Sequence, residues 1–241
     1  MSYAPQNPLV VQGDHTILLE TLSPGFEAAR DALLAFAELV KSPEYVHTWR
    51  ITPLSLWNAA AAGHGPDEVV ETLRKYAKYP VPENVPASIR AHMARYGRLR
   101  LVRDGERLRL ESDDPAALIE VQALKVASDL LGQGDANGVP VLVRARGELK
   151  QVLLAAGHPV EDLAGYDDGD ALKMALSPGW SMRDYQVDAV DAYLGGAAGG
   201  SGVVVLPCGA GKTVVGIAAM VRLGMRTLIV CTGHTALQQW K

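Results

Sequence analysis

Residues 203–213 constrain the possible folds of this chain more than any other segment. They read Val-Val-Val-Leu-Pro-Cys-Gly-Ala-Gly-Lys-Thr, which is an apolar run, a glycine-rich loop and the polar start of a helix. Helices and strands are predicted to alternate around this segment, namely helix 183–194, strand 203–206, helix 212–223, strand 227–230 and a helix from 235 onward. Such alternation is typical of a parallel sheet covered by helices. The sequence therefore predicts the start of an α/β domain over 179–241.

The glycine loop has the composition of a phosphate-binding site. Glycines let backbone amides turn towards one point, and the N-terminus of the following helix favours an anion there. Lys212 would then reach the β- and γ-phosphates, and the Thr213 hydroxyl would hold Mg²⁺. Upstream, the Gln186 amide can both donate to and accept from the edge of an adenine. The simpler alternative is a glycine-rich turn between strand and helix, with an exposed lysine.

We therefore expect ATP and Mg²⁺ as cofactors. The predicted nucleotide-binding residues are Arg183, Gln186, Pro207, Cys208, Gly209, Ala210, Gly211, Lys212 and Thr213. Within this set, Lys212 and Thr213 are the candidate catalytic residues, and Thr213 is the candidate ligand of the metal that accompanies ATP.

In the first half of the chain, residues 98–101 and 107–110 both read Arg-Leu-Arg-Leu, with Asp104-Gly105 between them. This period-two alternation predicts a β-hairpin with leucines on one face and arginines on the other. Further predicted elements are strands 9–11, 16–19 and 46–51, a helix from Ser23-Pro24 reaching Val40, and three short helices at 54–62, 66–77 and 86–97. Three helices followed by a hairpin is the order of a winged helix, which predicts such a module over about 52–112.

The charge of the chain is segregated. The net charge is −4, yet residues 88–110 hold seven arginines against two acidic residues. A local basic surface of this kind can contact the phosphates of duplex or forked DNA without reading sequence. Thr232, between the predicted strand 227–230 and the helix from 235, could hold a further phosphate. A solvated charged face is the alternative for the arginines, and a helix cap is the alternative for Thr232. The predicted DNA-binding residues are Arg90, Arg95, Arg98, Arg100, Arg107, Arg109 and Thr232.

Between these regions, residues 113–178 resemble a small α/β unit, with helices at 113–131 and 146–156 and a strand at 139–143. The fold prediction is an α+β N-terminal region, 1–112, then this unit, then the α/β domain at 179–241. Only two cysteines occur, and their spacing matches no zinc pattern. The sequence contains neither an apolar run long enough to cross a membrane nor a secretion signal, so we expect a cytoplasmic protein without membrane contact.

Several motifs in the sequence resemble those of superfamily-two helicases. These are Arg-Asp-Tyr-Gln at 183–186, Leu-Pro-Cys-Gly-Ala-Gly-Lys-Thr at 206–213, and Cys-Thr with Gln-Trp-Lys between 231 and 241. Segments 8–12, 47–58, 93–99 and 162–166 are similar to the bacterial branch of the xeroderma pigmentosum group B (XPB) helicase family.

The resemblance implies an accessory region, a domain likened to a damage-recognition domain, and the start of the first RecA-like motor domain. It implies an ATP-driven 3′-to-5′ DNA helicase or translocase of DNA repair, and it allows for a nuclease partner. The Asp-Glu-x-His motif, the Arg-Glu-Asp motif and the second motor domain of such helicases do not occur in this sequence. We therefore expect a fragment of a longer protein that is inactive by itself as an ATPase.

Two alternatives are a non-catalytic DNA-binding adaptor with a vestigial nucleotide loop, and another phosphate-loop enzyme such as a restriction-type translocase or a nucleotide kinase. A kinase would need neither Gln186 nor the arginine hairpin.

Overall fold

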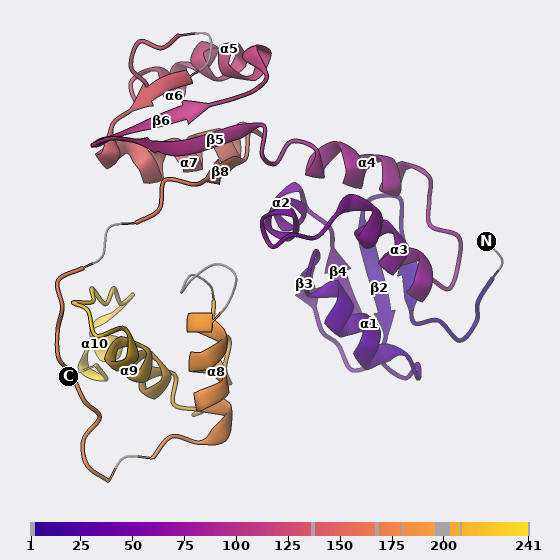
Figure 1. The fold of residues 1–241 in the computed structure, drawn as a ribbon. Helices are drawn as coiled ribbons and strands as arrows, with labels where there is room; N and C mark the ends of the chain where they lie inside the picture. Colours follow the sequence, from indigo (N-terminus) through magenta and orange to yellow (C-terminus); the bar gives the residue numbers. More distant parts are fainter. Residues whose placement is uncertain are drawn as a thin grey trace. The chain divides into compact units, whose positions relative to one another are not determined.

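A computed structural model describes residues 3–135, 138–166, 169–179, 181–195, 203–207 and 209–240. The chain divides into two compact units, residues 1–165 and 166–241 (Figure 1). Among the residues that the structure describes, no helix is both long and apolar enough to cross a bilayer.

The first unit begins with an antiparallel four-stranded sheet in the order β1-β2-β4-β3. Its strands are β1 (Leu9–Val11), β2 (Thr16–Glu20), β3 (Glu38–Lys41) and β4 (Val46–Arg50), and helix α1 (Phe26–Leu33) lies between β2 and β3 in the chain. The expected helix reaching Val40 is therefore wrong in its second half. Pairing of Leu39 with Trp49 of β4 supplies the backbone hydrogen bonds there, while Phe36 and Ala37 stay buried in the turn after the helix.

Helices α2 (Pro53–Ala61), α3 (Pro66–Tyr76) and α4 (Asn84–Met93) pack with this sheet in one hydrophobic core. Helix α2 starts with a capping box. The Thr52 side chain accepts a hydrogen bond from the Ser55 amide, and the Ser55 hydroxyl accepts one from the Thr52 amide. The Trp57 indole donates to the His92 carbonyl oxygen at 2.9 Å and so joins α2 to α4. The three predicted helices are present, but their buried residues belong to the same hydrophobic core as the first sheet.

A second, mixed sheet has the order β7-β6-β5-β8. Strands β5 (Leu99–Asp104) and β6 (Arg107–Glu111) form the predicted hairpin, β7 (Gly138–Val141) extends it, and β8 (Val160–Asp162) pairs in parallel with β5. Helices α5 (Pro115–Ala123), α6 (Lys125–Ser128) and α7 (Arg146–Ala155) cover its leucine face. The predicted helix 113–131 is interrupted at Leu124, whose ψ of 109° is extended.

The hairpin turn differs slightly from the prediction. Asp104 pairs with Arg107, so the two loop residues are Gly105 and Glu106. Gly105 has φ +59°, which a two-residue hairpin loop needs at its first position and which glycine adopts without strain.

The winged helix expected over 52–112 is not formed. Leu99, Leu101, Leu108 and Leu110 of the hairpin are buried with α5 and α7, whereas α2, α3 and α4 belong to the core of the first sheet. The element order is that of a winged helix, but the leucine face of the hairpin is covered by helices that follow it in the chain.

The second unit contains α8 (Asp184–Gly195), α9 (Lys212–Leu223) and α10 (His234–Gln238), with Val190, Val215, Ala218 and Ala219 as its core. The predicted strands 203–206 and 227–230 are not strands in the described residues. Val203, Val205, Leu228 and Val230 are 85–89% exposed, and only Leu206 and Ile229 of the two predicted strands are half-buried. A strand also needs hydrogen bonds to a neighbouring strand, and the structure shows no such ladder for the described residues 203–207 and 226–230.

Candidate functional site

The glycine loop contains two residues whose backbone conformation favours glycine. Gly209 and Gly211 have φ values of +81° and +77°, in the left-handed region that glycine favours. Helix α9 begins directly after Gly211, so its first amides point towards the loop without acceptors inside the helix. Cys208 lies outside the described residues. The sequence prediction of a loop followed by a helix at Lys212 is confirmed.

Gln186 of α8 is tied to this loop. Its side chain is 5% exposed, its amide nitrogen donates to the Ala210 carbonyl oxygen at 2.8 Å, and its amide oxygen accepts from the Arg183 amide at 3.0 Å. The Tyr185 hydroxyl donates to the same Ala210 oxygen at 3.0 Å. A Cβ on Gly211 would lie 2.7 Å from the Gln186 amide nitrogen, so the glycine also makes room for Gln186.

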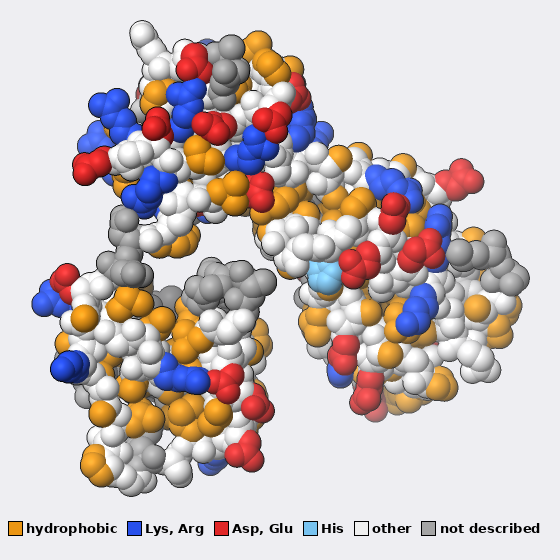
Figure 2. All heavy atoms as spheres, viewed as in Figure 1, with side chains coloured by type: hydrophobic (Ala, Val, Ile, Leu, Met, Phe, Trp, Pro, Cys, Tyr) orange, Lys and Arg blue, Asp and Glu red, His pale blue; other side chains and the backbone are white. Residues whose placement is uncertain are grey.

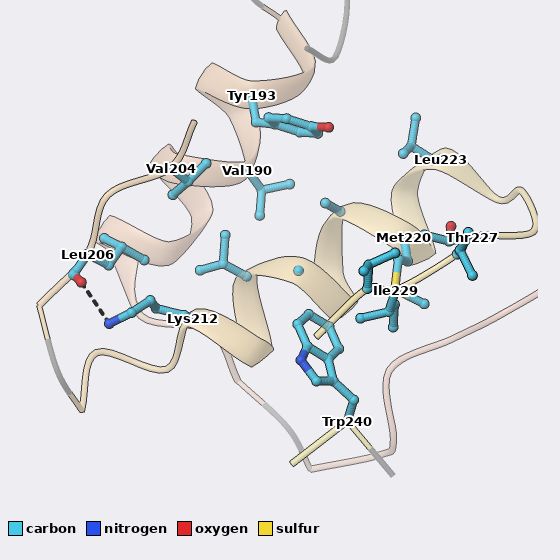
Figure 3. A pocket seen from close by; sticks show the side chains of 15 residues that line it. Val190, Tyr193, Val204, Leu206, Lys212, Met220, Leu223, Thr227, Ile229 and Trp240 are labelled. Atoms are coloured by element: carbon cyan, nitrogen blue, oxygen red, sulfur yellow. Dashed lines mark hydrogen bonds between the residues drawn. The ribbon is translucent and has the colours of Figure 1, made fainter. Parts of the chain in front are cut away.

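The Lys212 ammonium rests on the carbonyl oxygens at the start of the loop. It donates to the Leu206 oxygen at 2.8 Å (Figure 3) and to the Pro207 oxygen at 2.9 Å. Lys212 itself is exposed, and its charge has no carboxylate partner among the described residues. The ammonium is therefore available to an anion in the loop, because two neutral carbonyls are weaker partners than a phosphate.

Two cavities of different character border the loop. One, of about 400 Å³, is lined by Gly179, Ser181, Arg183, Gln186, Gly209, Ala210, Gly211 and Val214. The other, of about 370 Å³, is mostly apolar and lies between α8, α9 and the extended segments around 204 and 229 (Figure 3). Because the first cavity brings the glycines, a guanidinium and the Gln186 amide together, it suits a nucleotide better than the apolar one.

The donor set of the polar cavity fits an adenine nucleotide. Arg183 and the loop residues Gly209, Ala210 and Gly211 line this cavity and could donate to phosphates, and Gln186 keeps one N–H beyond its contact with Ala210. Lys212 lines the apolar cavity on the other side of the loop. Thr213 is the second residue of α9 and half-buried, at the position where its hydroxyl could hold a cation bound to the phosphates. When bound, ATP with Mg²⁺ would supply a phosphoryl group for transfer.

Replacing Gln186 by leucine is expected to weaken binding of Mg-ATP by about 5- to 50-fold, because the Ala210 carbonyl and the Arg183 amide lose a buried partner. Titration with a fluorescent ATP analogue measures this. Gln151→Leu, on an exposed position of α7, is the matched control and should leave affinity unchanged. Equal affinity of Gln186→Leu and the unaltered chain would mean that the contact of Gln186 with the glycine loop does not support nucleotide binding.

The predicted DNA-binding residues are spread over three regions. Arg90 on α4 forms an ion pair with Asp67 of α3 at 2.8 Å, and Arg95 donates to the Gly157 carbonyl oxygen at 3.3 Å. Thr232 is exposed just before α10 in the second unit. Arg95 lines one cavity together with Arg98 of the hairpin. We call the hairpin arginines Arg98, Arg100, Arg107 and Arg109 the arginine surface.

Three members of the arginine surface are held by carboxylates. Arg100 makes two hydrogen bonds of 2.7 Å to Asp113, Arg98 pairs with Asp114, and Arg109 pairs with Asp135 at 2.7 Å. The hydrogen bond from Arg100 lowers the pKa of Asp113, and the one from Arg98 lowers the pKa of Asp114. Arg107 is exposed and forms no ion pair with any residue that the structure describes.

Sequence reasoning missed a buried charge cluster between α7 and β8. Asp162 is 10% exposed, accepts two hydrogen bonds from Arg146 at 2.8 and 2.9 Å, and accepts a third from Lys150 at 2.8 Å. Burial by itself would raise the pKa of Asp162, but the hydrogen bonds from Arg146 and Lys150 outweigh it, so the pKa is lowered. The spacing of Arg146 and Lys150, one helical turn apart, is the only signal for this cluster in the sequence.

Comparison with known proteins places this chain in a family. A family model described as a helicase conserved C-terminal domain matches residues 9–135, more than half of the chain. A relative from Kineococcus radiotolerans named DNA 3'-5' helicase XPB is 51% identical over 97% of this chain, and one of the same name from Mycobacterium tuberculosis is 52% identical over 97%. The chain belongs to the XPB helicase family.

The match covers only part of the relatives. This XPB-family chain spans 42% and 43% of the length of the two bacterial helicases. A general transcription and DNA repair factor IIH helicase/translocase subunit XPB from Enterocytozoon bieneusi is 29% identical over 97% of the chain. The model described as type III restriction enzyme, res subunit, matches residues 179–241, which include the glycine loop.

Proposed function

We propose that this chain is the nucleotide-loop and DNA-contact part of an ATP-dependent DNA helicase that moves 3′ to 5′ and acts in DNA repair. The contact of Gln186 with the glycine loop at Ala210 carries the proposal, because a loop that only connected two elements would not need a buried amide against it. The names of the bacterial relatives support the direction of movement and the DNA substrate.

Within this proposal, residues 179–241 begin a RecA-like ATP-binding domain, and 1–112 and 113–178 are the accessory and damage-recognition-like domains. The match of residues 179–241 to the restriction-enzyme family model supports the first assignment. In the parent helicase, Arg183, Gln186, residues 207–211, Lys212 and Thr213 would bind Mg-ATP, and Lys212 would balance charge on the transferred phosphoryl group.

The proposed DNA contact gives a direct test. Replacing Arg98, Arg100, Arg107 and Arg109 by glutamine is expected to weaken duplex binding similarly for all sequences. Each lost phosphate contact removes about 0.9 from the slope of log affinity against log salt, so the slope should fall by about two to four. The fold should persist, because the leucine face of the hairpin remains buried.

Fluorescence anisotropy with labelled duplexes at several salt concentrations measures both quantities. The matched control replaces Arg30, Arg74, Arg222 and Arg226, four arginines outside the hairpin, and changes the net charge equally. If the two quadruple variants bind alike, the arginine surface is a solvated face and makes no phosphate contacts.

A non-catalytic DNA-binding adaptor with a vestigial nucleotide loop is the second candidate function. Mg-ATP binding by the unaltered chain decides between the two, because an adaptor with a vestigial loop would show none.

A further inference from the structure

The arginine surface is matched by carboxylates that come from fixed places in the fold. Asp113 and Asp114 lie between β6 and α5, and Asp135 lies in the loop before β7. Each reaches a different guanidinium: Asp113 that of Arg100, Asp114 that of Arg98, and Asp135 that of Arg109. In Figure 2, acidic and basic side chains are interspersed over the body that contains β5 and β6.

Of these carboxylates, Asp113 binds its guanidinium in the way that a phosphate would. Asp113 accepts two parallel hydrogen bonds of 2.7 Å, one from Nη1 and one from Nη2 of Arg100, whereas both oxygens of Asp135 lie against the single Nη2 of Arg109, at 2.7 and 2.8 Å. Two parallel N–H···O bonds are also the geometry in which arginine grips a phosphate diester. The side chains of Asp113 and Asp135 are 84% and 63% exposed, so an incoming phosphate can reach both pairs from solvent.

The backbone holds two of the three carboxylates in register. Asp114 caps α5 by accepting a hydrogen bond from the Ala116 amide at 3.0 Å. Asp135 accepts from the Gly138 amide at 3.0 Å, and a Cβ on Gly138 would lie 2.6 Å from Nε of Arg109. Gly138 therefore leaves room for Arg109 to reach Asp135. This is a built arrangement, whereas a chance surface pair would lack such support.

Further acidic groups near the arginine surface make this face net negative. Glu111 and Glu161 lie near Arg100, and Glu111 and Asp104 lie near Arg109. Together with Asp113, Asp114 and Asp135, these groups place six carboxylates against the four arginines of the arginine surface. Long-range attraction for DNA is therefore weak, and contact must involve exchange of partners at each arginine.

We propose that Asp113, Asp114 and Asp135 occupy the positions of DNA phosphates on the arginine surface, and that duplex binding exchanges each carboxylate for a phosphate. This inference rests on the proposed DNA contact. Exposed ion pairs are weak, so the exchange is cheap enough to occur, yet each carboxylate lowers the affinity. Each freed carboxylate also gathers a cation, which offsets part of the counterion release from DNA.

The test replaces Asp113, Asp114 and Asp135 together by asparagine in the 241-residue chain. Asparagine keeps the shape and caps helices as well as aspartate does. Duplex affinity is expected to rise about 3- to 10-fold, and the salt slope should become steeper by about one to two. The control replaces Asp31, Asp170 and Asp191 by asparagine. These residues pair with arginines outside the hairpin, and their replacement removes the same number of negative charges.

A combined variant separates exchange from a general change of charge. In the background of Arg98, Arg100 and Arg109→Gln, the three Asp→Asn changes should have no effect beyond that of the control. Equal gains from the hairpin set and the control set overturn the exchange. If the arginine changes alone leave duplex binding unaltered, the proposed DNA contact fails as well. Weaker binding by the arginine variant with no gain from Asp→Asn overturns only the exchange.

Discussion

Replacing Lys212 by alanine is expected to lower the affinity of the chain for Mg-ATP by about 10- to 100-fold. The Lys212 ammonium lies 2.8 and 2.9 Å from two loop carbonyl oxygens, beside the first amides of α9. A charge-assisted hydrogen bond to phosphate is worth more than the two neutral contacts that it replaces. Titration with a fluorescent ATP analogue in Mg²⁺ measures the loss.

Lys173→Ala is the matched control, because Lys173 is an exposed lysine of the same unit and is outside the loop. The helix should survive in both variants, since Lys212 occupies its first position and alanine favours helix. Circular dichroism checks this. Unchanged affinity of Lys212→Ala would mean that the nucleotide, if it binds, binds somewhere other than in the glycine loop.

The second large effect is expected at Asp162. Its replacement by asparagine removes the charge that faces Arg146 and Lys150 and leaves two cations near an amide in a mostly buried place. Breaking such a pair costs about 2–4 kcal/mol, somewhat below the range for fully buried pairs because Lys150 is 36% exposed. The transition of the first unit in calorimetry should fall by about 5–12 °C.

The same cluster sets a dependence on pH. The folded pKa of Asp162 is lowered, so its stabilisation is present above the unfolded pKa, near 3.9, and is lost as the pH falls below it. The difference in stability between the unaltered chain and Asp162→Asn should therefore shrink below about pH 4. Asp129→Asn, at an exposed position, is the control. A difference that stayed constant down to pH 2 would contradict the ion-pair account.

Local patterns in the sequence predicted local structure well. The Arg-Leu repeats predicted the hairpin and its buried leucines, and the glycine loop predicted the start of α9 at Lys212. Both depend on neighbours within a few residues, where periodicity and glycine φ decide the outcome. The only error there was one residue in the hairpin turn.

Features that depend on distant partners could not be predicted in this way. The hairpin was assigned to the helices before it, while its leucines pack on α5 and α7 after it. The apolar run at 203–206 is typical of a buried strand, but it does not show whether another strand lies beside it. The partners Asp113 and Asp135 of the arginine surface were likewise invisible, because a charge pattern along a strand does not reveal which loop folds back onto it.

The parallel pairing of β8 with β5 has a consequence for the order in which this chain folds. The hairpin of β5 and β6 can form as soon as both strands exist, but Leu99 must wait for Val160 before its other edge is covered. During synthesis, the edge of β5 therefore stays open while α5, β7 and α7 are made, and closing so long a loop is slow. Asp162 lies at the end of β8 and is synthesised after Arg146 and Lys150. The ion pairs that hold β8 against α7 can therefore form only after the whole sheet has been made.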